Sequence, residues 1–263
     1  KRDRPGAATS AVAVSRGGEP LKRGRVRPLG NGSTTISASF GGKSVSVPLT
    51  AERVGDALPI NFPNQVVPIF TKLGCNNGGC HGKASGQNGF RLSLLGFEPD
   101  LDYMTLVKEG RGRRLMPAAP EQSLLLTKGT GQVAHGGGRK MEYNSEEYKI
   151  VRRWIAAGMP FGRDDDPVVT KITVYPEHRV LAKQDRQQLA VYAHYSDGTI
   201  EDIPRRAQYE SNETEIANVD AAGLVSSLAI TGQAADMARY QGQVTVFRVS
   251  VPLGGDKQRY EFT

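Results

Sequence analysis

Near its two ends the chain alternates apolar and polar residues, and this pattern restricts its fold more than any other feature. Alternation with a period of two, rich in Ser, Thr and Val, is typical of half-buried β-strands. Gly41-Gly42 separates two of these runs and predicts a tight hairpin turn, because glycine accepts the positive φ angles that such turns require. The expected strands span residues 11–14, 34–40, 43–47, 171–175, 188–195 and 243–251.

The two β-rich regions share an order of sequence features, which predicts an internal repeat. Gly41-Gly42 follows one expected strand as Gln241-Gly242 follows another. Both regions also contain Ser-Val-Pro-Leu, at residues 46–49 and 250–253. The first region has no counterpart of residues 168–212. We therefore expect it to form only the second half of a β-sandwich, whose other strands precede the first residue in a longer protein.

Four short motifs stand out in the β-rich part of the chain. They are Tyr195-Ser196-Asp197-Gly198, Ile216-Ala217-Asn218-Val219-Asp220, Gly223-Leu224-Val225 and Ala238-Arg239-Tyr240. On these residues both β regions resemble bacterial immunoglobulin-like domains of group 2, which implies a seven-strand-type β-sandwich. Domains of this kind mostly serve as spacers or binding modules.

The middle of the chain, residues 60–163, has the pattern of a small helical domain. Ser145 with Glu146 is typical of a capped helix start, and Gly158 followed by Pro160 is typical of a helix end. The glycine-rich loops of such a small domain are better tolerated when a bound group fills its centre. The expected helices span residues 62–73, 98–109, 121–126 and 145–157.

The only two cysteines of the chain lie in this middle region, in the sequence Cys75-Asn-Asn-Gly-Gly-Cys80-His81. A pair of cysteines followed directly by histidine is typical of c-type haem attachment, in which the thiols bond to the porphyrin and the histidine binds iron. The usual motif is C-x-x-C-H, whereas here four residues separate the cysteines. We expect this glycine-containing insert to bulge, since glycine tolerates positive φ angles. A Cys75–Cys80 disulfide and a zinc site with a fourth ligand are the alternatives.

Further stretches of the middle region carry a second resemblance, at residues 75–94, 117–125, 135–138 and 152–161. They resemble planctomycete-type cytochrome c domains. The resemblance covers residues 60–163 and implies one covalent haem c, attached through Cys75 and Cys80 with His81 on the iron. It also implies that the domain stands beside group 2 immunoglobulin-like domains in a large exported protein.

His135 is the expected second axial ligand of the iron. Three glycines follow it, which lets the backbone pass close to a porphyrin, and related cytochromes place a ligand at this point before the last helix. Met141 and Met116 are the thioether alternatives, and an open or water-bound iron is the remaining one. The other histidines, expected to be ordinary surface or strand residues, are His178 and His194.

Other side chains are expected to surround the haem. Arg113 or Arg114 could pair with a propionate, because guanidinium binds carboxylates through two hydrogen bonds; a solvated loop is the alternative. Phe90 and Trp154 are expected to pack on the haem edge or in the core. The residues expected to line the pocket are Leu92, Leu94, Leu124 and Ile155.

The formal net charge of +7 is spread along the chain, with basic clusters at residues 1–4, 22–25 and 111–114. No nucleic-acid motif accompanies them, so nucleic acid is not an expected partner. A basic surface also suits an acidic redox partner or an anionic polysaccharide. No apolar run reaches the roughly 18 residues that span a membrane, and no signal peptide is visible.

Together these features predict a multi-domain chain of α plus all-β class, with a partial immunoglobulin-like segment at residues 1–55, a mainly helical cytochrome c-like domain at 60–163 and an immunoglobulin-like β-sandwich at 167–263. The expected function is electron transfer to or from a catalytic domain of a larger protein, as a redox module more than a stand-alone enzyme. A haem enzyme or sensor with an open iron site, and a non-redox adhesion or carbohydrate-binding array, are the alternatives. Thioether attachment outside the bacterial cytoplasm implies a periplasmic or otherwise exported protein.

Overall fold

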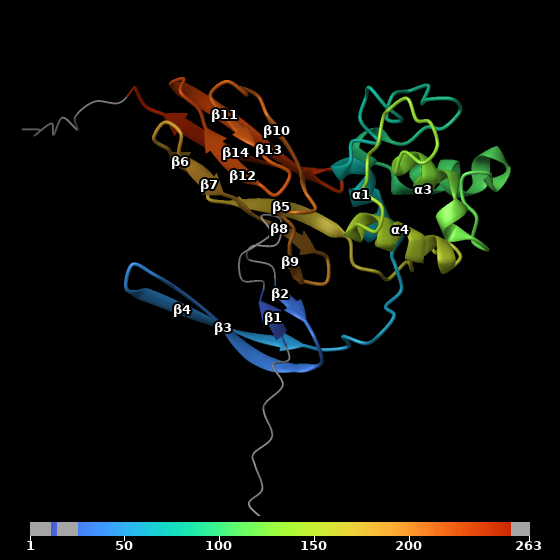
Figure 1. Ribbon diagram of the computed structural model, residues 1–263, viewed down its shortest axis with the longest axis horizontal. Coiled ribbons are helices and arrows are strands. Elements are labelled where there is room, and N and C mark those ends of the chain that lie inside the picture. Colours follow the sequence, from blue (N-terminus) through green and yellow to red (C-terminus); the bar gives the residue numbers. More distant parts are fainter. Residues whose placement is uncertain (1–11, 15–25, 254–263) are drawn as a thin grey trace, which may run out of the picture. The chain divides into compact units, whose positions relative to one another are not determined.

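The computed structural model describes residues 12–14 and 26–253, and the chain divides into two compact units, residues 1–58 and 59–263 (Figure 1). The basic clusters at residues 1–4 and 22–25 and the first residue of the expected strand 11–14 lie outside the described residues. No helix among the described residues is both long and apolar enough to cross a membrane.

The first unit consists of two antiparallel β pairs. β1 (Val12–Val14) pairs with β2 (Val26–Pro28), and β3 (Gly32–Phe40) pairs with β4 (Lys43–Ala51). Gly41 and Gly42 have φ angles of 56° and 76° between β3 and β4, so the hairpin expected at this point is confirmed.

The second unit begins with the helical region, in which helices are found at all four expected places. Ser145 caps the last of them, because its hydroxyl oxygen accepts a hydrogen bond from the backbone N–H of Tyr148 at 3.2 Å. Helix by helix the segments are η1 (Phe62–Val66), α1 (Val67–Lys72), η2 (Leu94–Gly96), α2 (Pro99–Tyr103), η3 (Met104–Lys108), η4 (Glu109–Gly112), η5 (Pro120–Gln122), α3 (Leu124–Gly129) and α4 (Glu146–Ala156).

Aromatic side chains form the centre of this helical region. Trp154 of α4 is fully buried, and its indole N–H donates to the carbonyl of Pro160 at 2.8 Å. The Phe62 ring lies 5.1 Å from the Trp154 ring and 6.5 Å from the Phe70 ring. This packing holds α4 against η1 and α1.

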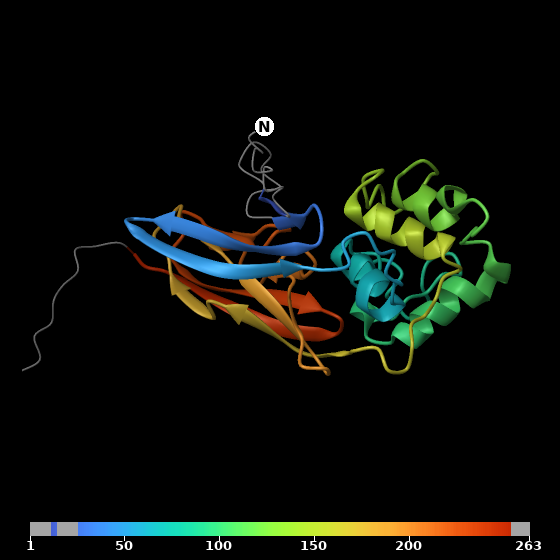
Figure 2. The same ribbon diagram turned by 90° about the horizontal axis from the view of Figure 1, so that it is seen from below.

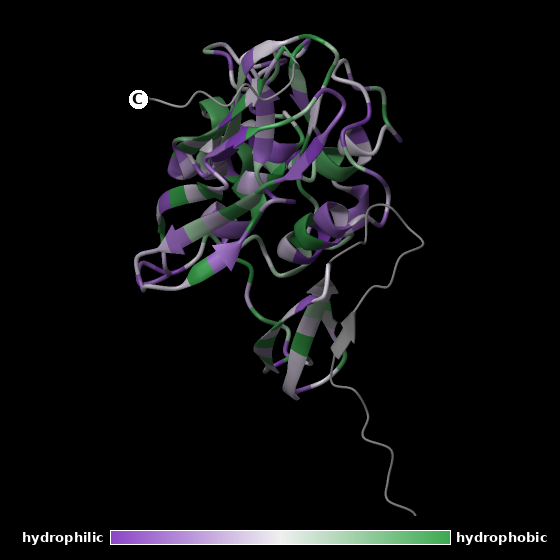
Figure 3. Cartoon of the chain, turned by 90° about the vertical axis from the view of Figure 1, so that its left-hand side faces the viewer, coloured by the Kyte–Doolittle hydropathy of each residue, from purple (hydrophilic) through white to green (hydrophobic). Residues whose placement is uncertain are grey.

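The rest of the second unit is a β-sandwich. Its sheets have the strand orders β10-β13-β14-β6, β5-β8-β9 and β11-β12-β7, and the alternation of apolar and polar residues along the strands is visible in Figure 3. The strands are β5 (Val169–Tyr175), β6 (His178–Val180), β7 (Arg186–Gln188), β8 (Ala190–Tyr195), β9 (Ile200–Asp202), β10 (Gln208–Ser211), β11 (Ala217–Val219), β12 (Leu224–Ser227), β13 (Gly232–Tyr240) and β14 (Gln243–Val251).

The sandwich and the helical region have separate hydrophobic cores, yet they belong to one compact unit, with the helices gathered at one end of the strands (Figure 2). Lys72 of α1 donates to the carbonyl of Ala207 at 2.6 Å and also to that of Ala221. In the opposite direction, Arg206 of the sandwich donates to the carbonyl of Asn64 at 2.6 Å. These hydrogen bonds, one set in each direction, link the helical region to the sandwich.

The expected repeat is present as two matching hairpins, β3–β4 and β13–β14. Both strands are nine residues long in each hairpin, and Gly32 and Gly232 begin them with φ angles of 152° and 150°. In this correspondence Gly32 matches Gly232 and Ala51 matches Val251. The two Ser-Val-Pro-Leu sequences therefore do not coincide, because the turns fix the register and place the first sequence inside β4 and the second at the end of β14.

Candidate haem site

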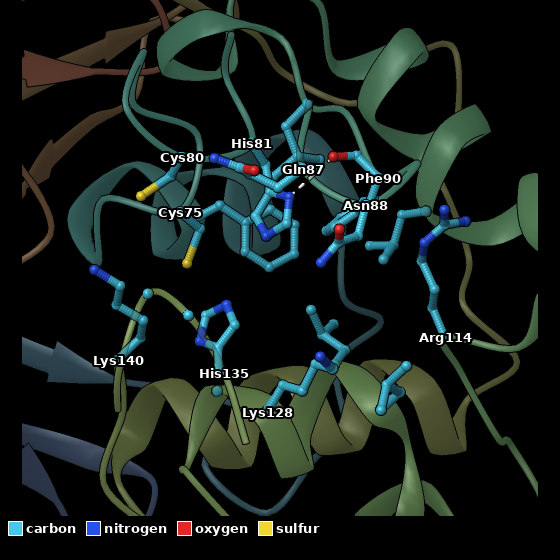
Figure 4. Close-up of a pocket in the computed structure, with 18 of the residues that line it drawn as sticks. Cys75, Cys80, His81, Gln87, Asn88, Phe90, Arg114, Lys128, His135 and Lys140 are labelled. Carbon is cyan, nitrogen blue, oxygen red and sulfur yellow. Dashed lines mark hydrogen bonds between the residues drawn. The ribbon is translucent and has the colours of Figure 1, made fainter. Parts of the chain in front are cut away.

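A cavity of about 400 Å³ lies in the helical region (Figure 4). The size is within the range of small-molecule and cofactor sites. Its walls are mainly apolar. Several cationic side chains also line it, and none of the lining residues is Asp or Glu. They include Phe70, Cys75, Cys80, His81, Gln87, Asn88, Phe90, Leu92, Leu106, Arg113, Arg114, Leu124, Leu125, Lys128, Gly129, His135, Lys140 and Met141.

The cysteine motif forms a tight loop directly after α1. The N–H of Cys75 donates to the carbonyl of Phe70 at 2.8 Å, and the N–H of His81 donates back to the carbonyl of Cys75 at 3.0 Å. A Cβ atom at Gly82 would lie 1.9 Å from the carbonyl oxygen of Asn76, so the residue after His81 must be glycine for the loop to close.

The four inserted residues between the cysteines form a turn that does not use the positive φ angles glycine allows. None of them takes a positive φ angle, and Asn76 is fully buried, with its amide nitrogen 2.9 Å from the hydroxyl oxygen of Thr71. The insert is anchored rather than loose, because the N–H of Leu95 also donates to the Asn76 carbonyl at 3.1 Å. Asn76 therefore packs against α1 and the segment around Leu95, while Gly78 and Gly79 are exposed.

Both cysteines line the cavity as free thiols, and their sulfur atoms lie at the same end of it in Figure 4. Burial raises the pKa of the Cys75 thiol from 9.0 to about 12, with Lys140 opposing the rise. A thiol with a pKa this far above its usual value stays protonated at neutral pH when no metal or covalent partner is bound.

His81 is held in the form that a metal requires. Its Nδ1 lies 2.9 Å from the carbonyl oxygen of Phe90, and because a carbonyl can only accept, Nδ1 carries the proton and Nε2 keeps its lone pair. Burial lowers the pKa of His81, which also favours the neutral imidazole.

His135 has the same arrangement on the opposite wall. Its Nδ1 lies 2.8 Å from the carbonyl oxygen of Gly138, which leaves its Nε2 free for the same reason. The rings of His81 and His135 are parallel within 5°, with centroids 6.3 Å apart, and they extend toward one another across the cavity (Figure 4). A metal bonded to two imidazole nitrogens at about 2 Å each needs ring centres about 6 Å apart, so this pair fits a bis-histidine metal.

Arg114 and Arg113 differ in what their side chains contact. The buried guanidinium of Arg114 donates to the carbonyls of Thr105 at 2.8 Å and Gly89 at 2.6 Å, and it lies 4.8 Å from the centre of the Phe90 ring. Arg114 thus holds the segment whose carbonyl bonds His81. Arg113 lines the cavity, and it is the member of the pair with the freer guanidinium for an anionic group.

Other expected site residues are distributed between the cavity and the core. Phe90, Leu92 and Leu124 line the cavity, as does Met141, which is buried with its methyl carbon 3.2 Å from where a Cβ of Gly129 would be. The remaining four do not line it: Trp154 and Ile155 lie in the hydrophobic core of the helical region, Leu94 is exposed, and Met116 is half exposed.

Lys128 and Lys140 line the cavity without having been singled out in the sequence. Neither belongs to a motif. The fold places both in the wall of the cavity and brings Lys140 near Cys75, and that placement is not visible in the sequence.

Among the described residues no group of three or more His, Cys, Asp or Glu is placed to hold a metal ion. A closed zinc site built from Cys75, Cys80 and His81 would be such a group.

The sandwich that follows the helical region has a family match. Residues 168–238 match the bacterial Ig-like domain (group 2), which confirms the resemblance inferred for the second β region. No curated protein matches the chain.

Several solved structures with similarity to the chain are of the S-layer protein SbsC. A structure of the S-layer protein SbsC shares 21% identity over 36% of this chain and 14% of that chain, with a TM-score of 0.31. SbsC domains 4 and 5 share 18% identity over 33% of this chain and 53% of that chain, with a TM-score of 0.28. The matched region is thus a small part of the first of these chains.

Proposed function

We propose that residues 60–163 form a c-type cytochrome module that binds one haem c and transfers single electrons. The observation that carries the proposal is the facing pair His81 and His135, each with Nδ1 bonded to a backbone carbonyl and Nε2 free. Cys75 and Cys80 lie beside this pair in the same cavity. Two thiols and two axial nitrogens around one cavity are the protein groups that covalent haem requires.

The two histidines would hold the iron, and their backbone bonds would fix how they do so. A hydrogen bond from Nδ1 to a carbonyl sets the tautomer, fixes the ring orientation and raises the basicity of the other nitrogen. The bond between Arg114 and Gly89 supports this at His81, since it holds the chain segment next to Phe90. Both rings are therefore oriented before any iron binds.

The remaining wall residues suit the two ends of an amphipathic macrocycle. Phe70, Leu92 and Leu106 contribute an apolar wall, and Arg113 offers positive charge for a propionate, whereas Lys140 lies at the thiol end beside Cys75. Cationic side chains pair with propionate carboxylates through charge-assisted hydrogen bonds.

When bound, the haem supplies reversible one-electron chemistry, and the protein tunes it through ligand type and burial. Two histidine ligands favour a lower reduction potential than a histidine–methionine pair. The redox partner would be an acidic protein surface or a catalytic domain of the same protein. The match to a bacterial immunoglobulin-like family at residues 168–238 and the thioether chemistry both support an exported or surface location.

A second function is proposed for the sandwich alone. The family match at residues 168–238 favours a spacer or binding module, for example toward a polysaccharide. The reciprocal bonds of Lys72 and Arg206 would make this sandwich a rigid support for the haem domain rather than a freely tethered one.

Intact-mass analysis tests the proposal. The chain should be produced in a bacterial periplasm together with a cytochrome c maturation system, then denatured and measured. The expected result is a mass increase of one haem that survives denaturation and is absent when Cys75 and Cys80 are both replaced by Ser. Protein that never gains this mass under conditions that mature a control cytochrome would contradict the proposal.

A further inference from the structure

The β3–β4 ribbon of the first unit has two unlike faces. On one face serine and threonine hydroxyls pair across the strands, Ser33 with Thr50 at 3.0 Å, Ser37 with Ser46 at 2.7 Å and Ser39 with Ser44 at 3.0 Å. Such a row of cross-strand hydroxyl bonds suits a face turned to water. One face of the ribbon is therefore built for solvent.

The opposite face is apolar. Ile36 is opposite Val47 and Ala38 is opposite Val45 in the strand register, and side chains directly opposite one another share a face. Val45 is 62% exposed and Val47 is 58% exposed. Within the part of the chain that the structure describes, β3 and β4 pair only with each other. A two-stranded hairpin alone is marginally stable, so this face requires a cover.

The matching hairpin of the second unit indicates what that cover is. Position for position, Val47 corresponds to Phe247 and Leu49 to Val249, and both of these are fully buried. They share one hydrophobic core with residues of β5 and β8, including Val174 and Val191. The hairpin edges are also occupied, since β10 pairs with β13 and β6 pairs with β14.

From this correspondence we infer that the apolar face of β3–β4 docks an immunoglobulin-like half-sandwich with the pattern of residues 169–211. A strand of the β10 type would pair with β3, a strand of the β6 type with β4, and a layer of the β5–β8 type would cover Ile36 and Val47. A second copy of this chain has no such segment to spare, because its residues 169–211 already cover β13–β14.

The test is a fusion in which a duplicate of residues 168–211 precedes the full chain. Hydrogen exchange followed by mass spectrometry would be measured on peptides from β3–β4, with peptides from β13–β14 of the same molecule as the internal reference for folding. The expected result is slower exchange in β3–β4 of the fusion than of the unfused chain, on the order of 100-fold. The measurement needs no haem, so its outcome is independent of the cytochrome proposal.

Two matched variants of the fusion sharpen the test. Val47→Asp places a charge on the docking face and should abolish the added protection. Ser37→Asp places the same charge on the hydroxyl face and should leave it in place. Protection that is unchanged by the fusion, or that falls equally in both variants, would overturn the inference. An unfused chain that sediments as a dimer with β3–β4 already protected would overturn it as well, because a second copy would then be the cover.

Discussion

The imidazole rings of His81 and His135 lie parallel within 5° and 6.3 Å apart across the cavity, although the two residues come from separate loops. Each ring is fixed by its own backbone carbonyl, Phe90 for His81 and Gly138 for His135. Neither carbonyl bond depends on the other ring. The spacing is therefore a property of the folded protein, and it is the spacing that a metal between the two Nε2 atoms needs.

Removal of His135 should change the spin state of the haem. In the matured protein we expect a low-spin spectrum, because two imidazoles form a strong axial field, and His135→Ala should give a high-spin form with an open position. Optical and electron paramagnetic resonance spectra measure this.

Two control variants accompany His135→Ala. Met141→Leu tests the thioether alternative within the same cavity, and His178→Ala tests a histidine of the sandwich that lies 3.3 Å from the hydroxyl of Ser250. Both should remain low-spin. If Met141→Leu instead gave the high-spin form, Met141 and not His135 would be the second ligand.

Loss of Arg114 should destabilise the helical region before any haem is bound. Its guanidinium is the donor for the carbonyls of Thr105, Glu109 and Gly89, and Arg114→Met would leave these part-buried acceptors without it. We expect the free energy of unfolding to fall by about 2–3 kcal/mol, measured by urea denaturation of the apoprotein. Arg113→Met is the control and should change stability by less than about 0.5 kcal/mol. Equal losses in the two variants would refute the distinction between the neighbouring arginines.

Lys72, which joins α1 to the sandwich, should make the free energy of unfolding rise at alkaline pH. Burial lowers the pKa of Lys72 from 10.5 to about 8, with Glu147 and Asp220 opposing the change. Between these two values the unfolded chain binds more protons at this amine than the folded chain does, so stability should rise as the pH rises from about 8 to 10.5.

Comparison of Lys72→Met with the parent protein isolates this contribution. The variant should lose the part of the alkaline rise that comes from Lys72, seen in chemical denaturation at a series of pH values. Lys149→Met is the matched control, since Lys149 is an exposed lysine of α4, and it should keep the whole rise. Parallel pH profiles for all three proteins would show that Lys72 is not the source.

Local patterns predicted many of the helices, strands and turns, and tertiary packing decided which side chains meet. The Gly41-Gly42 hairpin, the Ser145 cap and the Cys75–Cys80–His81 loop follow from neighbouring residues, which is why they could be read in the sequence. Trp154 was expected at the haem or in the core, and the structure places it in the core, because its ring stacks near Phe62. Lys128 and Lys140 line the cavity because of how α3 and the following loop are placed. No short sequence pattern predicts that placement.

The contacts of Lys72 and Arg206 with the opposite domain were also not predictable. Each side chain donates to a backbone carbonyl. Every residue has such a carbonyl, so the residue type of the acceptor does not indicate the hydrogen bond. The burial of Asn76, whose amide donates to the hydroxyl of Thr71, was not predictable from the motif either.

The most direct test of the central claim is a visible spectrum of the protein after periplasmic maturation, reduced minus oxidised, followed by acid–acetone extraction. We predict a c-type α-band that stays with the polypeptide after extraction and disappears in the Cys75→Ser, Cys80→Ser double variant. A protein without a Soret band, made beside a control cytochrome that matures normally, would contradict the haem assignment and leave a Cys75–Cys80 loop or metal site as the alternative.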